Sequence, residues 1–385
     1  MSLFALITAL LLEQIHPLSS RKYLFGLLSG YVKFFQQHFN AGQQRHGKIA
    51  WLLAVLPMLA GAIVLYQLLY RVNPIFAWAF NVLVLYLTMG FRQFSHYFTD
   101  IHQALRNGRL DEARRLLSDW RGMTSHELNA EEVARLTIEQ ALIASHRNVF
   151  GVIVWFVLFS AVGLGGAAGA LLYRLGQFLR WHLGGGYDTV GRSPQVREYP
   201  PHPRSRDRLA TPVTSRGGDQ DEAEPEGLVD GEWGRDEFGG FSRLAFYFLD
   251  WLPVRLTAMT FAIVGNFEDT IYCWRTQAAS WSEAEKHLMK PLAIPLGGQK
   301  TTAKRLVMAG HPNEAGILLS SGAGALGVRL GMPIQQGGLL LDRPELGIGD
   351  DADTDFMQST VGLVWRSVVF WLILLMLLTL SNLLG

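Results

Sequence analysis

Long stretches without a charged residue limit the folds open to this chain more than any other feature. Residues 49–70 and 74–91 are two such stretches, joined by a short link that contains Arg71. A third lies near the end of the sequence, at residues 367–384. A helix of about 20 apolar residues crosses the hydrocarbon core of a bilayer. We therefore predict an all-α, polytopic integral membrane protein, with the first two stretches forming a helical hairpin.

A further uncharged stretch, residues 149–173, is broken near its middle by Gly163 and Gly165. Each half is too short to span a bilayer alone, so two readings remain: one kinked span, or a re-entrant pair of helices. The segments 92–148 and 174–243 on either side are rich in arginine, and arginine-rich loops favour the cytoplasmic side. The charge pattern therefore favours the re-entrant reading.

Residues 244–265 are apolar but contain Asp250, Pro253 and Arg255. Charged side chains inside a membrane are costly and are usually paired or functional. We interpret this segment as an interfacial helix whose two charged residues lie near the lipid headgroups.

The remaining segments read as soluble. Residues 92–148 carry apolar residues at helical spacing, with a turn at Asn107-Gly108 and a second helix beginning near Asn129. The predicted organisation begins with residues 1–91, the N-terminal membrane helices and hairpin, and 92–183, the cytoplasmic helices and the glycine-broken segment. Residues 184–240 form a disordered insert, for which a solvated linker is the favoured reading and a binding tail for a protein partner the alternative. A C-terminal region with motifs (241–334), an acidic loop (335–358) and a last transmembrane helix (359–385) follow.

Composition excludes several kinds of function. Lys and Arg total 34 against 33 Asp and Glu, so net charge gives no reason to expect a nucleic-acid partner. Cys273 is the single cysteine, which rules out an intrachain disulfide and a cysteine metal cluster. The sequence contains neither a phosphate-binding P-loop nor an HExxH motif.

Other metal signals in the sequence are weak, and we assign no metal ligand. Asp351, Asp353 and Asp355 begin like a calcium-binding loop, but Phe356 occupies the position of the required glycine. The histidines show no ligand spacing, and we interpret them as packing or interface residues: His16, His96, His102 and His146.

Short motifs along the chain occur in an order that one known family shares. Tyr173-Arg174 follows a glycine element, residues 251–257 read W-L-P-V-R-L-T, and Asn313 precedes the glycine-rich stretch 322–331. These motifs resemble those of the CbiB/CobD family, membrane proteins in a superfamily that also includes AmpE. Enzymes of that family attach aminopropanol phosphate or ethanolamine phosphate to adenosylcobyric acid, an ATP-dependent, amide-forming step of cobalamin biosynthesis.

The resemblance implies an adenosylcobinamide-phosphate synthase type of ligase in the bacterial inner membrane, with a corrinoid substrate and with ATP and magnesium as cofactors. It also implies a set of site residues. The catalytic candidates are Glu139 and Asp250, and the substrate-binding candidates are Arg135, Arg174, Arg255, Asn313 and Arg329.

Three positions depart from the family pattern by replacing an acid. Ile143, Arg180 and Tyr247 stand where the family has acidic residues. Magnesium prefers carboxylate oxygens, and none of these side chains supplies one. Either Glu139, Asp250 and the acids of residues 350–355 take over, or ligase chemistry is lost. The alternative function is therefore a non-catalytic, AmpE-like inner-membrane regulator or scaffold.

Overall fold

The protein is built mainly of α-helices, which confirms the predicted class. The computed structural model describes residues 2–15, 30–31, 44–183, 237–288, 314–336 and 339–384. The helices are α1 (Ser2–Ile15), α3 (Gln44–Val72), α4 (Pro74–Thr88), α5 (Phe91–Arg106), α6 (Leu110–Arg121), α7 (Ala130–Ser145), the π-helix η1 (His146–Phe150), α8 (Gly151–Ala161), α9 (Gly166–Leu183), α10 (Glu237–Val264), α11 (Phe267–Leu288), α12 (Glu314–Leu326) and α13 (Thr354–Leu384).

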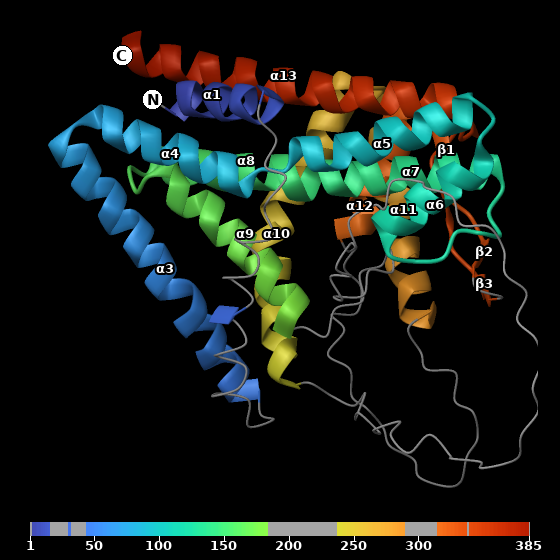
Figure 1. The fold of residues 1–385 in the computed structure, drawn as a ribbon, viewed down its shortest axis with the longest axis horizontal. Helices are drawn as coiled ribbons and strands as arrows, with labels where there is room; N and C mark the ends of the chain where they lie inside the picture. The colour runs from blue at the N-terminus through green and yellow to red at the C-terminus, as the bar shows by residue number, and fades with distance from the viewer. Residues whose placement is uncertain are drawn as a thin grey trace, which may run out of the picture.

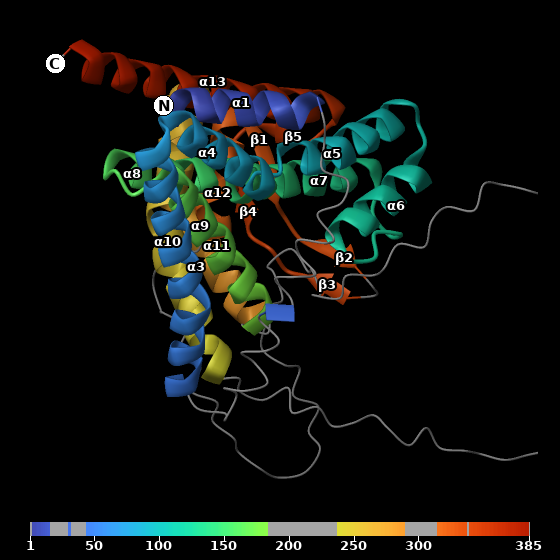
Figure 2. The same cartoon turned by 60° about the vertical axis from the view of Figure 1, so that its left-hand side comes forward.

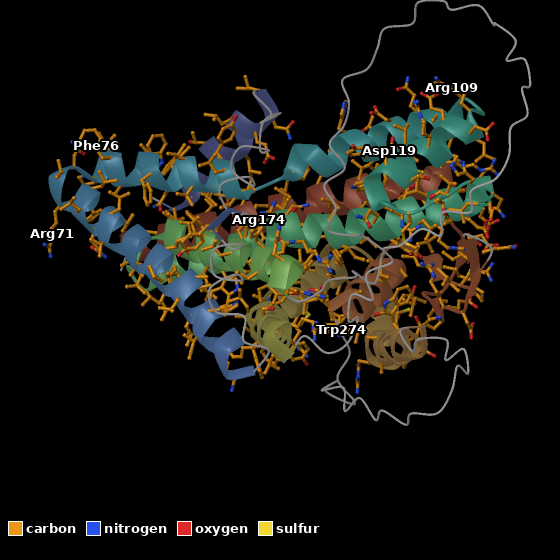
Figure 3. The ribbon with its side chains drawn as sticks, turned by 60° about the horizontal axis from the view of Figure 1, so that its bottom comes forward. Arg71, Phe76, Arg109, Asp119, Arg174 and Trp274 are labelled. Atoms are coloured by element: carbon orange, nitrogen blue, oxygen red, sulfur yellow. The ribbon has the colours of Figure 1, made fainter. Side chains whose placement is uncertain are left out.

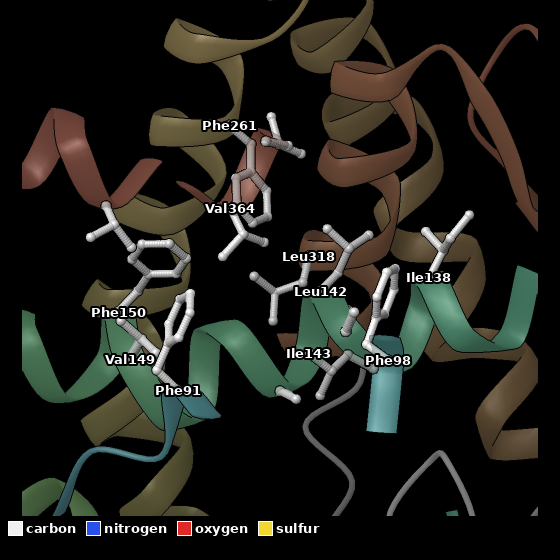
Figure 4. Packing of buried hydrophobic residues seen from close by; sticks show 14 of the residues in the cluster. Phe91, Phe98, Ile138, Leu142, Ile143, Val149, Phe150, Phe261, Leu318 and Val364 are labelled. Carbon is white, nitrogen blue, oxygen red and sulfur yellow. The ribbon is translucent and has the colours of Figure 1, made fainter. Parts of the chain in front are cut away.

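One continuous helical rod, formed by α7, η1 and α8, runs through the middle of the molecule (Figure 1). In the most apolar 18-residue stretch of the rod, 72% of the residues are buried, whereas the corresponding shares are 22% in α3 and 33% in α13. In Figure 4 its side chains Leu142, Ile143 and Phe150 lie among apolar residues of neighbouring elements, including Phe261 and Val364. The rod is therefore the core around which the other helices pack.

The glycine-broken segment turns back on itself. Gly163 and Gly165 adopt the left-handed conformation, with φ of 78° and 89°, and reverse the chain between α8 and α9. The two helices then pack closely, because a Cβ on Gly169 would lie 2.1 Å from the carbonyl oxygen of Trp155. Both readings of this segment stay predictions, because α8 continues from α7 as one helix, Ala130–Ala161, that is long enough to cross a membrane.

Four helices are long and apolar enough to cross a membrane: Gly47–Val72, Ala130–Ala161, Gly240–Val264 and Thr354–Ser381. The outer surfaces of α3 and α13 expose large apolar side chains such as Leu56, Leu68, Ile373 and Leu377. Apolar surface of this extent is unfavourable in water and suits contact with lipid. A membrane protein is therefore the class that the structure supports.

The figures show how the helices are arranged. α1 and α13 lie side by side along one edge, parallel to the central rod, while α3, α9 and α10 descend from it (Figures 1 and 2). Figure 3 places Arg71 and Phe76, at the α3–α4 turn, and Arg109, at the α5–α6 turn, at opposite ends of the molecule. Arg174, on α9, lies between these ends.

Local sequence signals correctly located several helix boundaries. Asn73 accepts a hydrogen bond from the Ile75 backbone N–H at 2.9 Å and so begins the second helix of the predicted hairpin. Asn129 and Glu132 form a reciprocal capping box at the start of α7. The predicted turn at Asn107-Gly108 falls between α5 and α6.

A small β region follows α12 and differs from the predicted acidic loop. β1 (Val328–Gly331) pairs with β4 (Glu345–Leu346) in antiparallel and with β5 (Asp350–Asp351) in parallel orientation, with Leu330 opposite Leu346. β2 (Ile334–Gln336) and β3 (Leu339–Leu341) form an antiparallel hairpin. Asp353 accepts from the backbone N–H groups of Asp355 and Phe356, so it caps α13.

The α8–α9 contact predicts the effect of a single added methyl group. Gly169→Ala places its Cβ against the Trp155 carbonyl, and we expect a cost of about 1–3 kcal/mol in the free energy of unfolding from overpacking. Gly61→Ala is the matched control, because Gly61 is also helical but has open space around it, so alanine should stabilise by about 0.5–1 kcal/mol. Denaturant titration in detergent micelles measures both values. Equal effects at the two positions would contradict the close packing.

Candidate functional site

A buried polar network joins η1, α9 and α10. His146 Nε2 lies 2.9 Å from Asp250 Oδ1, and His146 Nδ1 lies 2.9 Å from Thr257 Oγ1. The Tyr173 hydroxyl donates to the same Asp250 oxygen at 2.8 Å. All four side chains are 2% exposed or less. We call this group the His146–Asp250 network.

Hydrogen-bond partners assign the protons of this network. The Thr257 hydroxyl donates to the Pro253 carbonyl at 3.0 Å, so it accepts from His146 Nδ1–H. Nε2 of His146 then shares one proton with Asp250, either as an imidazolium facing a carboxylate or as a neutral pair. The network is therefore built to hold and release a single proton.

The local backbone places these groups together. A π-helix inserts an extra residue into the helical turn and is frequent at functional sites. Here η1 carries His146 at its start. A Cβ on Gly151 would lie 2.2 Å from the Tyr173 ring, so only glycine at this position lets Tyr173 reach Asp250.

A second set of charges adjoins the network at the start of α12. Glu314 Oε1 accepts from both Arg147 and Arg180, the latter at 2.6 Å. Burial alone raises the pKa of a carboxyl group, but the two guanidinium groups hold the pKa of Glu314 well below its usual 4.5. Glu314 also lies within electrostatic range of Tyr173.

This arrangement gives a partner to one residue that departs from the family pattern. Arg180, where the family has an acid, pairs with Glu314 and lies 5.1 Å over the ring of Phe246. Phe246 in turn packs against Tyr173, with ring centroids 5.6 Å apart. A cation has replaced an acid here, and an acid from α12 balances it.

Glu139 lies in a separate cluster two turns earlier on the rod. Its carboxylate makes two hydrogen bonds with Arg343, at 2.8 and 2.9 Å, and accepts from the Gly331 backbone N–H. Leu142 packs between the two clusters, where a Cβ on Gly322 of α12 would meet it at 2.5 Å. The two predicted catalytic acids therefore belong to different groups.

The remaining predicted residues are spread over the molecule. Arg174 donates to Asn148 and Gln177, on the α9 edge near the His146–Asp250 network. Arg255 stacks on the Trp251 ring at 4.3 Å, at the surface. The other outcomes are that Arg135 donates to the Met332 sulfur, that Arg329 pairs with Asp351, and that Asn313 lies outside the described residues.

Two sequence-based interpretations are wrong. Asp250 was expected near the headgroups, but it is buried inside the protein and only Arg255 reaches the surface. His146 was expected to be a packing residue, but it makes two buried polar contacts.

The described residues do not fit a resident magnesium site. In the described part of the chain no group of three His, Cys, Asp or Glu side chains is arranged so that it could hold a metal ion. Glu139 and Glu314 are held by arginines, and the Oδ2 oxygen of Asp250, which accepts no hydrogen bond from the described residues, lies within range of the Glu314 carboxylate. One such oxygen is far short of the six ligands that magnesium takes.

Comparison with known proteins shows a likeness to one family. The family model described as CobD/Cbib protein matches residues 5–180, which include His146, Tyr173 and Arg180. The matched part is just under half of the chain, so the chain is similar to this family. It is 29% identical over 393 residues to "Cobalamin biosynthesis protein CobD" of Stutzerimonas stutzeri, covering 98% of each chain.

A second relative carries the same name. The Chromobacterium violaceum protein is 28% identical over 325 residues, covering 84% of this chain and 76% of the relative. No solved structure matches the chain. Nothing in these comparisons favours the AmpE-like alternative over the CobD/CbiB assignment.

The charges around Glu314 predict a pH-dependent stability difference. Because its pKa is lowered in the folded protein, Glu314 stabilises fully above about pH 4.5, and this contribution is lost as the pH falls through the folded pKa. Glu314→Gln should therefore cost about 3–5 kcal/mol at pH 7 and progressively less below pH 4.5. Glu112→Gln, which removes an exposed partner of Arg109, should cost under about 1 kcal/mol. Unfolding titrations across this pH range test both, and a cost independent of pH would contradict the lowered pKa.

Proposed function

We propose that this protein is an inner-membrane enzyme of cobalamin biosynthesis that attaches aminopropanol phosphate or ethanolamine phosphate to adenosylcobyric acid. The observation that carries the proposal is the buried His146–Asp250 network beside the Arg147–Glu314–Arg180 group. Both relatives are named as cobalamin biosynthesis proteins, which supports a role in that pathway.

Amide formation requires the attacking amine to lose a proton. As a carboxylate paired with His146, Asp250 can accept it at Oδ2, the oxygen that receives no hydrogen bond from the described residues. Tyr173 and Thr257 fix the positions of both partners. In this proposal Asp250 keeps its role as a catalytic candidate, and His146 joins it.

The exposed fraction of the side chains increases from the His146–Asp250 network toward Arg180. The His146 side chain is fully buried, the Glu314 side chain is 10% exposed and the Arg180 side chain is 29% exposed. Arg180 therefore marks the side from which a substrate would approach. Arg147, Arg180 and Arg174 bring three guanidinium groups to this edge, and guanidinium groups bind anionic groups such as phosphate.

In this proposal ATP supplies the free energy for amide formation, as in the enzymes of the family, and magnesium accompanies the ATP. Magnesium bound to ATP would arrive with the substrate, and the described residues would then contribute arginines rather than a carboxylate cage. Every residue role above concerns binding or proton transfer and does not depend on the metal.

The proposed location is the bacterial cytoplasmic membrane, with several spans. The four long apolar helices and the exposed apolar faces of α3 and α13 support this placement. The insert at residues 184–240, proposed to bind a protein partner, lies almost wholly outside the described residues.

Complementation tests the proposed activity. A strain lacking its own aminopropanol-phosphate-attaching protein, given the wild-type chain, should make cobalamin from cobyric acid. Asp250→Asn should abolish this growth, since an amide cannot take up the shared proton. Asp111→Asn is the matched control, because the same change falls on an exposed residue of α6 and should leave growth intact.

Immunoblots of the membrane fraction must show all three proteins at similar levels. Absence of growth with wild-type protein in the membrane would count against the ligase function. Full growth with Asp250→Asn would remove the network from the mechanism while leaving the pathway assignment in place.

A further inference from the structure

The Glu139 cluster contains more buried hydrogen-bond donors than acceptors. Nε and Nη1 of Arg121, Nε of Arg135 and Nε1 of Trp281 have no hydrogen-bond partner within the described ranges. All three side chains are 4% exposed or less. Buried polar atoms are nearly always paired, so a set of unpaired donors in one place needs a physical explanation.

These donors gather around the turn after β1. Arg135 Nη1 reaches the Met332 sulfur at 3.3 Å, and Arg343 Nε donates to the Met332 carbonyl at 3.2 Å. The Arg343 guanidinium lies 5.2 Å from the centroid of the Trp281 ring. Arg121, at the end of α6, lies within electrostatic range of Arg343 and Glu139. Four elements that are far apart in the sequence therefore bring donors to this cluster: α6, α7, α11 and the β3–β4 link.

The charges of this cluster do not balance. Three guanidinium groups, those of Arg121, Arg135 and Arg343, face one carboxylate, Glu139, and both Glu139 oxygens already bind Arg343. The thioether of Met332 is a weak acceptor and carries no charge. The nearby acids Glu345 and Asp351 pair with Arg329 instead and are about half exposed.

Arg121 stays charged in spite of its burial. Burial, and then the neighbouring charge of Arg343, lower the pKa of Arg121 from 12.5 to about 10. At neutral pH the group remains protonated. A buried cation with two unpaired N–H atoms is costly, and an anion that accepts from them would remove most of that cost.

We propose that Arg121, Arg135 and Trp281 bind an oxyanion of the phosphate class. Its oxygens would accept from the unpaired guanidinium and indole N–H groups, and a doubly charged phosphate would balance the two excess positive charges. This site lies beyond Leu142 from the His146–Asp250 network, so it is a second anion site. The inference does not rest on the proposed function.

Thermal unfolding of the full-length protein in phosphatidylcholine nanodiscs tests the site with inorganic phosphate as the probe. The wild-type Tm should rise with phosphate concentration, by about 3 °C at a hundredfold excess over Kd. Arg121→Met should lose this rise while remaining folded, because methionine removes the unpaired charge and keeps much of the volume. Arg115→Met is the matched control, an exposed arginine on the same helix that should keep the full rise.

A second variant covers the outcome in which Arg121→Met fails to fold. Trp281→Phe keeps the ring under Arg343 and removes only the indole N–H, so it should weaken phosphate binding about tenfold. No wild-type shift with phosphate at up to about 10 mM, or equal shifts in wild type and variant, would overturn the proposal.

A further experiment distinguishes a soluble phosphate from a lipid headgroup as the bound phosphate group. Nanodiscs containing phosphatidylglycerol, without added phosphate, should leave the Tm unchanged if the site binds a soluble phosphate. An Arg121-dependent rise from the lipid alone would assign the site to a headgroup, which keeps the phosphate class and changes the source.

Discussion

The contact between His146 and Asp250 is the interaction on which the site depends, because it connects the central helical rod to α10 inside the core. Neither residue is accessible to water, so neither can be charged without the other. Tyr173 and Thr257 complete the hydrogen bonding, and the glycine at position 151 gives Tyr173 room. The packing of η1, α9 and α10 is thus set by one buried polar network.

The same helical rod organises the second cluster. Glu139 and His146 are seven residues apart, which corresponds to about two helical turns and about 10 Å. α12 packs across Leu142 between them, with Glu314 at its first residue on one side and Gly331, beyond its end, on the other. Both clusters join acids to arginines from distant parts of the chain, and Arg180 belongs to the first of them.

The sequence predicted the parts of the fold that local patterns control. Uncharged stretches located α3, α4 and α13, and capping residues such as Asn129 located helix starts. The continuity of α7 into α8 was missed, because an amphipathic pattern changes there to an apolar one within a single helix. The short strands after α12 depend on pairing between distant residues, which periodicity does not reveal.

The candidate site was predicted only in part, for a similar reason. Family motifs pointed to Glu139 and Asp250, but partners are set by the tertiary structure. Arg343 is 204 residues from Glu139, and Glu314 is 134 residues from Arg180. A lone His146 carries no sequence signal of its role, since an unpaired histidine on a helix is compatible with simple packing. Only the position of Asp250 on the neighbouring helix shows the connection.

A double-mutant cycle between His146→Gln and Asp250→Asn measures the central interaction directly. The free energy of unfolding of the wild type, both single variants and the double variant is obtained by denaturant titration in one detergent. The account predicts a coupling of about 1–3 kcal/mol, with the double variant less destabilised than the sum of the single ones. Single effects that add to within about 0.5 kcal/mol would show that the two side chains act independently, and would contradict the network.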